Sequence, residues 1–240
     1  MPNNETKLHE AAYLNQTDKV TKLIAQNGDS INDRGLNGKL PLHYAVKGCR
    51  DTNLTYPEYR QESTTTPNKT FDEFQAQHAK IVQILIDAGA DLNAQDDDGN
   101  TALHHGSLPS PLLNIVTISS LHELTIPSIV PEDISQSLLN ANADPNVKNA
   151  HGDTPLHLAA IFNQPAVVSL LNAKADPNVK NNNGNTVIES LEKHKEEIEN
   201  YRGHEVYETT YNMLKGTSQD IGGEMHENSN LLGDVTTDKD

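Results

Sequence analysis

Asp153-Thr154-Pro155-Leu156-His157-Leu158-Ala159-Ala160 is the stretch of sequence that decides the fold, because altered copies of it occur earlier in the chain. The copies are Thr6-Lys7-Leu8-His9-Glu10-Ala11-Ala12, Leu40-Pro41-Leu42-His43-Tyr44-Ala45 and Thr101-Ala102-Leu103-His104. His43 follows His9 by 34 residues, and a weak copy at Thr186-Val187-Ile188 begins 32 residues after Thr154. A period of about 33 residues predicts a stack of similar structural units.

Each copy has the features of a helix start. A threonine before an apolar run is a good N-cap, because its hydroxyl accepts a hydrogen bond from an otherwise unpaired N–H of the first turn. Pro155 suits the first helical position, where its missing N–H costs nothing. The resulting helix is apolar on most of its surface and needs cover from a second helix. Apolar residues at helical spacing supply that cover downstream in each unit: Val20, Leu23 and Ile24; Ile81, Val82, Leu85 and Ile86; Leu138 and Leu139; Val167, Val168, Leu170 and Leu171.

The pattern resembles the ankyrin-repeat family over about residues 5–215. The resemblance implies an all-α solenoid of about five helix-turn-helix repeats, with projecting hairpin fingers and two inserted segments. The arms that follow the second helices, such as Ala88-Gly89-Ala90-Asp91-Leu92-Asn93, are similar to the family's fingers. We expect one domain over 1–216. Its parts lie at about 5–37, 38–98, 99–151 and 152–184, with a C-terminal cap at 185–216.

Two units are longer than the period. The insertion at 50–70 is polar and rich in turn residues, whereas the one at 108–130 is apolar and should pack as a short extra helix. Such insertions often bind partners, although surface decoration explains them as well. In the third unit Gly106-Ser107 replaces the usual alanine pair, which puts that inner helix in question. We expect residues 217–240 to form a disordered acidic tail.

Composition restricts the partners. The formal net charge is −16, with 18 basic and 34 acidic residues, so nucleic acid and anionic membranes are excluded and a basic protein surface is favoured. The single cysteine, Cys49, excludes an internal disulfide and suits a reducing compartment. No apolar run approaches the roughly 18 residues of a membrane span. We expect a cytoplasmic monomer without a membrane partner.

We expect no catalytic residue, metal site, cofactor or small-molecule substrate. Asp96-Asp97-Asp98-Gly99 resembles part of a calcium loop, but the register would place Ala94 and His105 where acidic ligands are required. Four histidines share one repeat position, which favours a structural hydrogen-bonding role: His9, His43, His104 and His157. Cys49 stands where the family usually has glycine, so a structural thiol is favoured over a nucleophile.

The resemblance implies a protein-binding scaffold or adaptor that uses the concave surface of finger tips and first helices. By position, that surface comprises Leu36, Asn37, Lys39, Lys47, Asp97, Asp98, Asn100, His151, Asp153, Ile161, Phe162, Asn182, Asn183 and Asn185. Ile161 and Phe162 suit apolar anchors, although packing against a neighbouring helix explains Phe162 equally well. Asp97 and Asp98 would attract a basic partner.

Two other hypotheses stay open at this point. One is an enzyme whose active groups lie in the insertions around Cys49. The other is an effector that an intracellular bacterium delivers into a host cell, suggested by the asparagine-rich composition, the degraded repeats and the acidic tail. In that case the tail would carry the secretion signal and the protein would act by binding a host protein.

Overall fold

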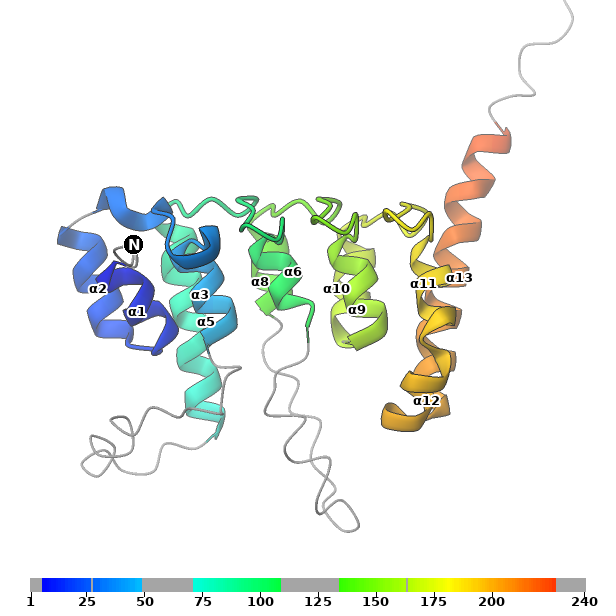
Figure 1. The fold of residues 1–240 in the computed structure, drawn as a ribbon, viewed down its shortest axis with the longest axis horizontal. Coiled ribbons are helices and arrows are strands. Elements are labelled where there is room, and N and C mark those ends of the chain that lie inside the picture. Colours follow the sequence, from blue (N-terminus) through cyan, green and yellow to red (C-terminus); the bar gives the residue numbers. More distant parts are fainter. Residues whose placement is uncertain (1–5, 27, 49–70, 109–133, 163, 228–240) are drawn as a thin grey trace, which may run out of the picture.

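The chain forms two layers of helices that run side by side along one axis (Figure 1). The computed structural model describes residues 6–26, 28–48, 71–108, 134–162 and 164–227. Within these residues every regular element is helical, which confirms the predicted all-α solenoid. The inner layer contains α1 (Lys7–Tyr13), α3 (Pro41–Gly48), α6 (Ala102–Gly106), α9 (Pro155–Phe162) and α11 (Val187–Lys193). The outer layer contains α2 (Thr17–Gln26), α5 (Phe71–Asp87), α8 (Ile134–Asn140), α10 (Gln164–Asn172) and α13 (His204–Glu227).

Each helix packs against its partner in the same unit and against the equivalent helix of the next unit. The inner helices contact one another in the order α1, α3, α6, α9, α11, and the outer ones in the order α2, α5, α8, α10, α13. One apolar core therefore runs through the stack, with fully buried leucines in successive units: Leu8, Leu42, Leu85, Leu103, Leu138, Leu156, Leu170 and Leu191. Contacts only between neighbours are the mark of a repeat stack.

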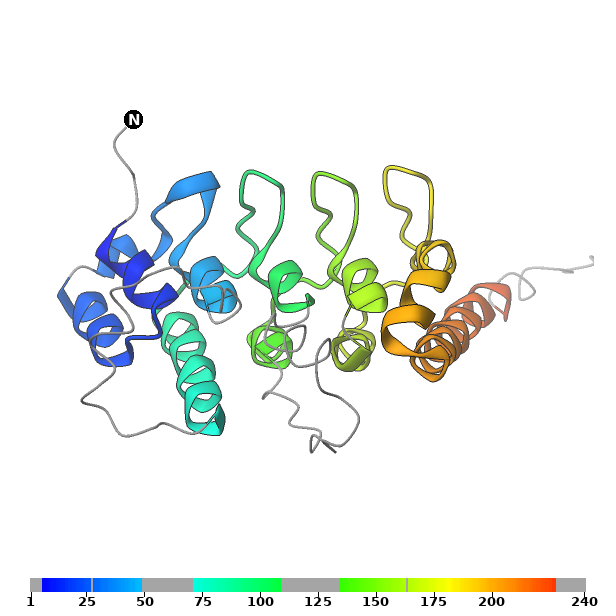
Figure 2. The same ribbon diagram turned by 60° about the horizontal axis from the view of Figure 1, so that its bottom comes forward.

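Four hairpin fingers project beyond the inner helices (Figure 2). We number them finger 1 (residues 34–39), finger 2 (95–100), finger 3 (148–153) and finger 4 (180–185). Finger 1 contains the short 3₁₀ helix η2 (Leu36–Gly38), and η1 (Gly28–Asn32) precedes it. A residue with positive φ ends the outer helix before each later finger: Gly89, Asn142 and Lys174. Glycine and asparagine adopt this conformation readily, whereas Lys174 adopts it at some cost.

The shared histidine joins each unit to the next one. In His104, Nδ1 accepts hydrogen bonds from the N–H and the hydroxyl of Thr101, at 3.1 and 2.9 Å, while Nε2 donates to the Asp153 carbonyl at 3.0 Å. The equivalent Nε2 bonds run from His9 to Lys39 O, from His43 to Asn100 O and from His157 to Asn185 O. The predicted structural role of these histidines is confirmed. Each ring is a neutral bridge with its proton on Nε2.

The fifth unit has Glu189 at the histidine position. The Thr186 N–H donates to Glu189 Oε2 at 2.7 Å, so the helix start is capped in the same way. A carboxylate, however, has no proton to donate to a following unit. The chain of bridges therefore ends here, where α12 (Lys195–Arg202) and α13 fold against α11.

The structure bears on three sequence predictions, which concern the third inner helix, the C-terminal boundary and the insertions. The inner helix α6 does form, and the loss of a side chain at Gly106 lets α8 approach, since a Cβ there would lie 3.2 Å from Ser135 Oγ. The helix α13 continues through the boundary expected at 216–217 as far as Glu227, and its buried residues before that boundary include Tyr207 and Leu214. The insertion at 50–70, most of the one at 108–130, and residues 228–240 lie outside the described residues.

We expect the free energy of unfolding to fall as the pH is lowered from about 6.5 to about 4. Burial lowers the pKa of His43 and of His104 to about 4, and it lowers the pKa of His157 too. In this window the unfolded chain binds protons that the folded chain does not, so protonation favours unfolding. Each such histidine adds about 1.4 kcal/mol per pH unit to the slope.

Urea unfolding of the wild type and of His104→Asn, repeated across this pH range, measures the effect. The variant should show a slope smaller by about 1.4 kcal/mol per pH unit. Asp96 does not confuse the result, because its pKa is lowered to about 2 and it titrates below this window. An equal slope in both proteins would mean that the folded chain accepts the proton on His104.

Candidate functional site

In each of the last three fingers, the side chain of the second residue holds the tip of that finger. Oδ1 of Asp96 accepts hydrogen bonds from the N–H groups of Asp98 and Asn100, at 3.1 and 2.8 Å. Asn149 and Asn181 make the same pair of bonds in fingers 3 and 4. The fifth residue of each of these fingers is a glycine with φ between 74° and 77°, a conformation that strains other residues. The third and fourth residues are left as exposed tips on a fixed backbone.

Finger 1 is built differently because Gly35 has no side chain to hold its tip. The N–H of Gly35 donates to the Lys39 carbonyl at 2.7 Å, and the second residue of each later finger makes the same backbone bond to its sixth residue at 2.9 Å. A Cβ at Gly35 would lie 3.0 Å from the ring of His9, so the bridging histidine excludes a larger residue there. The tip residue Leu36 is 54% exposed. Finger 1 therefore presents an apolar tip, in contrast to the polar tips of the others.

The finger tips are tied together through their backbones. Bonds of 3.0 Å run from Asp97 N–H to Asn37 O, from Ala150 N–H to Asp98 O, and from Asn182 N–H to His151 O. Asn182 Nδ2 adds a bond of 2.9 Å to the Ala150 carbonyl. Because the three backbone bonds do not involve side chains, the tip residues can vary while these bonds keep the spacing of the fingers. The tips are thus a surface of fixed geometry and free side-chain chemistry.

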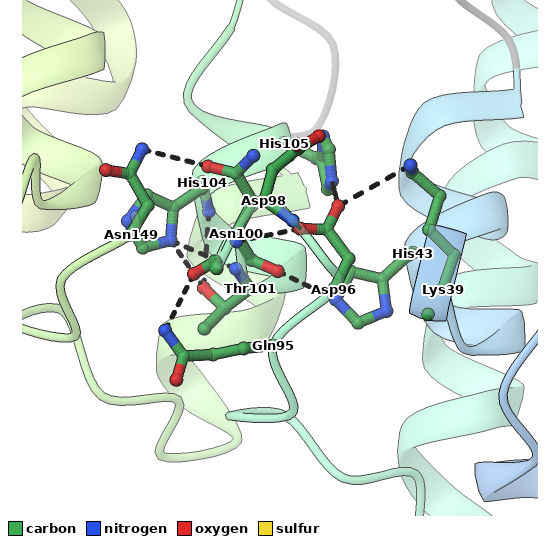
Figure 3. Close-up of polar contacts among 12 residues, drawn as sticks. Lys39, His43, Gln95, Asp96, Asp98, Asn100, Thr101, His104, His105 and Asn149 are labelled. Carbon is green, nitrogen blue, oxygen red and sulfur yellow. Dashed lines mark hydrogen bonds and ion pairs between the residues drawn. The ribbon is translucent and has the colours of Figure 1, made fainter. Parts of the chain in front are cut away.

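A buried charged cluster lies between fingers 1 and 2 (Figure 3). The carboxylate of Asp96 has no exposed surface, and its Oδ2 lies 2.9 Å from His105 Nε2 and 3.6 Å from Lys39 Nζ. Burial alone would raise the pKa of Asp96, but hydrogen bonds from His105 and the Asn100 backbone, with the charges of His105 and Lys39, lower it to about 2. The ring of His43 meets that of His105 edge to face, with centroids 5.8 Å apart.

We call the contact between one finger and the next a joint. The next two joints use a neutral pair and a singly charged pair where the first has Lys39 and Asp96. Asn149 Nδ2 donates to Asn100 Oδ1 at 3.0 Å, and Asn181 Nδ2 donates to Asp153 Oδ1 at 2.7 Å. The sixth residue of each finger therefore contacts the second residue of the following one. In finger 4 the sixth residue, Asn185, accepts from Lys193 Nζ at 2.9 Å. These side chains are engaged in holding the stack.

Two exposed apolar side chains lie on neighbouring helices of the fourth unit, one at the end of its helix and one in the middle. Phe162, at the end of the inner helix α9, is 38% exposed, and Val168, on the outer helix α10, is 43% exposed. Ile161 beside Phe162 is half-buried, and its carbonyl accepts from the guanidinium of Arg202 at 3.3 Å. Phe162 therefore offers an apolar contact on the inner layer, and Val168 offers one of similar exposure on the outer layer.

The structure divides the residues predicted for the binding surface into three groups. Eight are exposed: Leu36, Asn37, Asp97, Asp98, His151, Phe162, Asn182 and Asn183. Five are half-buried: Lys47, Asn100, Asp153, Ile161 and Asn185. Lys39 differs from the expected exposed position and is corrected here to a buried residue, whose ammonium group lies 3.6 Å from Asp96 Oδ2. Three of the half-buried residues, Asn100, Asp153 and Asn185, use their side chains in the joints described above.

Sequence reasoning missed the cluster around Asp96. From the sequence alone, Asp96 and His105 are placed only in the calcium-loop pattern, which the register excludes. The usable signal was that Asp96 shares its repeat position with Asn149 and Asn181, which marks it as a finger-building residue. Within the described ranges no group of three or more histidine, cysteine or acidic side chains is arranged to hold a metal ion. None of the described helices combines the length and apolar character needed to cross a bilayer.

Comparison with known families and proteins agrees with this architecture. The model for the ankyrin repeat matches residues 151–182, and a model for ankyrin repeats in many copies matches residues 75–108. The first match covers α9 and α10 with parts of fingers 3 and 4, and the second covers most of α5, finger 2 and α6.

Three curated relatives are similar to parts of the chain. An ankyrin repeat protein of Acanthamoeba polyphaga mimivirus is 33% identical over 145 residues, which is 60% of this chain and 20% of that protein. The E3 ubiquitin-protein ligase KEG of Arabidopsis thaliana is 26% identical over 65% of this chain and 9% of its own length. Human neurogenic locus notch homolog protein 1 is 32% identical over 65% of this chain and 6% of its own. The chain thus spans a fifth or less of the length of these relatives.

We expect Lys39 and Asp96 to be coupled in stability. Lys39→Asn should lower the free energy of unfolding by about 1 kcal/mol, because it removes a positive charge beside the buried carboxylate while His105 keeps its hydrogen bond to it. Combining it with Asp96→Asn recreates the amide pair of the following joint. The double variant should therefore be more stable than the two single effects predict, by about 1 kcal/mol or more.

Urea unfolding of the wild type, both single variants and the double variant gives the coupling free energy directly. The partly exposed Lys47 serves as the control, and Lys47→Asn should change stability by no more than about 0.5 kcal/mol. Simple additivity of the two single variants would show that the contact contributes nothing specific.

Proposed function

The chain is an ankyrin-repeat protein, and we propose that it acts as a scaffold that binds a partner protein across its finger tips and inner helices. Ankyrin repeats generally mediate binding to other proteins, which supports a protein–protein interaction role. The observation that carries the proposal is the fixed array of exposed tips. Their backbones are tied to one another, and the Asn182 amide adds one side-chain bond, to the Ala150 carbonyl of finger 3.

The exposed side chains define the kind of partner. Leu36 at finger 1 and Phe162 at the end of α9 offer apolar contacts. Between them along the stack, Asp97 and Asp98 carry two adjacent negative charges on the tip of finger 2. Large apolar side chains are typical anchors of interfaces, and rim charges raise the rate of encounter. A partner with a basic rim around an apolar patch fits this surface.

The two alternative hypotheses rest wholly or partly on residues outside the described part of the chain. The enzyme hypothesis needs active groups around Cys49, and the effector hypothesis needs a secretion signal in the tail at 217–240, of which 228–240 lie outside the described residues. The relatives named above come from a virus, a plant and a human, and their own activities belong to proteins at least five times longer than the matched segment. Both alternatives stay predictions from the sequence.

Phe162→Asp should abolish partner capture, while Val168→Asp should leave it intact. The two side chains have similar exposure, but one lies on the inner layer and the other on the outer layer. A charge at the centre of an interface typically costs 2 kcal/mol or more, so at least about a thirtyfold loss of affinity is expected.

The experiment captures proteins from a cell lysate on the wild type and on both variants, with circular dichroism as the check on folding. A protein that is lost with Phe162→Asp and retained with Val168→Asp would then be measured by calorimetry. Proteins lost equally with both variants, or only with Val168→Asp, would place the interface on the outer helices and contradict the proposal.

A further inference from the structure

Three hydrogen bonds near the finger bases are repeated at every joint. Between fingers 1 and 2, Asp91 N–H donates to Asn32 Oδ1 at 2.8 Å and Arg34 Nη1 donates to Gln95 O at 3.0 Å. The tip bond from Asp97 N–H to Asn37 O completes the set. The later segment thus contributes an N–H, a carbonyl four residues on, and a second N–H two residues beyond that.

The next two joints repeat this set in the same order and at the same spacing. In the second joint the bonds are Asp144 N–H to Asn93 Oδ1, Gln95 Nε2 to Lys148 O, and Ala150 N–H to Asp98 O. In the third they are Asp176 N–H to Asn146 Oδ1, Lys148 Nζ to Lys180 O, and Asn182 N–H to His151 O. The incoming segment begins with aspartate every time, although the donor to its carbonyl changes from arginine to glutamine to lysine.

Finger 4 carries the receiving half of a fourth set. Asn178, Lys180 and Asn183 hold the positions of Asn32, Arg34 and Asn37, and all three are exposed. Within the described part of the chain Asn178 Oδ1, Lys180 Nζ and Asn183 O have no hydrogen-bonding partner. A Cβ on Gly184 would meet nothing within 4 Å, whereas one on Gly99 or Gly152 would lie 2.6 Å from an N–H of the following finger.

The helical layers beside this edge are closed. Glu189 ends the histidine bridges, Lys193 occupies Asn185 Oδ1, and α12 and α13 cover α11 and α10. A second copy of this chain does not fit. If its finger 1 lay against finger 4, its α3 would follow α11 in the stack, and its α1, which packs on α3, would fall at the position of α11. Two such copies would place α1 and α11 in the same space. The occupant must therefore be a segment without helices of its own at that point.

We propose that the free edge of finger 4 binds an extended segment of a partner protein that carries an acidic residue at its first position. The segment supplies an N–H to Asn178 Oδ1, a carbonyl four residues later to Lys180 Nζ, and an N–H two residues beyond that to Asn183 O. The three occupied joints define this spacing and the aspartate at the first position. This edge differs from the side-chain surface of the tips, so the inference holds whether or not the proposed function does.

A synthetic cyclic peptide with the sequence of residues 142–153 is the probe, because this segment makes the same three bonds within the chain. Titration into the ¹⁵N-labelled full chain should shift the amide signals of residues 176–185, with a Kd of about 1 mM. A peptide methylated on the amide nitrogens of Asp144 and Ala150 has the same composition but lacks both donors. It should produce no shifts there.

Lys180→Ala and Lys148→Ala form a matched pair of variants. Both remove a lysine from the same repeat position, but Lys148 Nζ is already bonded within the chain and Lys180 Nζ is not. Lys180→Ala should weaken peptide binding by about threefold or more, and Lys148→Ala should leave it unchanged. The absence of shifts in 176–185 well above about 1 mM peptide, equal binding of the methylated peptide, or equal loss with both variants would each overturn the proposal.

Discussion

The bridging histidine is the interaction on which the rest of the structure depends. Its Nδ1 accepts from the cap of its own helix and its Nε2 donates to the finger of the next unit, so one side chain fixes both the start of a helix and the distance to its neighbour. The bridge works only with a neutral ring, and burial keeps the pKa of His43 and His104 low enough for that at neutral pH. Leucine and alanine contacts in the core then act between elements that are already in register.

Different residues of each finger hold the stack and form the exposed tip. The second and sixth residues hold the joints and the backbone ties the tips, while among the third and fourth residues the Asn182 side chain adds a bond to the neighbouring finger. A protein built this way can change its binding surface at the tips with little effect on stability. The same division explains why Lys39, a sixth residue, does not belong to the binding surface although it is adjacent to it in sequence.

Much of the fold could be predicted from the sequence because equivalent residues recur at the same position of each repeat. Four histidines at one position predicted a shared structural bond, and the apolar spacing of residues such as Ile81 and Leu85 predicted the outer helices. The site was less predictable, since exposure depends on which residue faces the next finger, and that contact joins Lys39 to Asp96 across 57 residues of chain. The length of α13 was missed because acidic composition alone cannot distinguish a solvated helix from a tail.

The charged pair between fingers 1 and 2 disfavours other pairings of the fingers. Similar units can in principle join in the wrong order, and a buried ion pair adds little net stability compared with a neutral pair. The pairs at this position differ along the chain, however: Lys39 with Asp96, Asn100 with Asn149, and Asp153 with Asn181. Joining Asp153 to Asp96 would bury two carboxylates together, and joining Lys39 to Asn149 would leave a buried ammonium without a counter-charge. The cost of these alternatives, rather than the strength of the native pair, explains a buried charge in a stack that elsewhere uses amides.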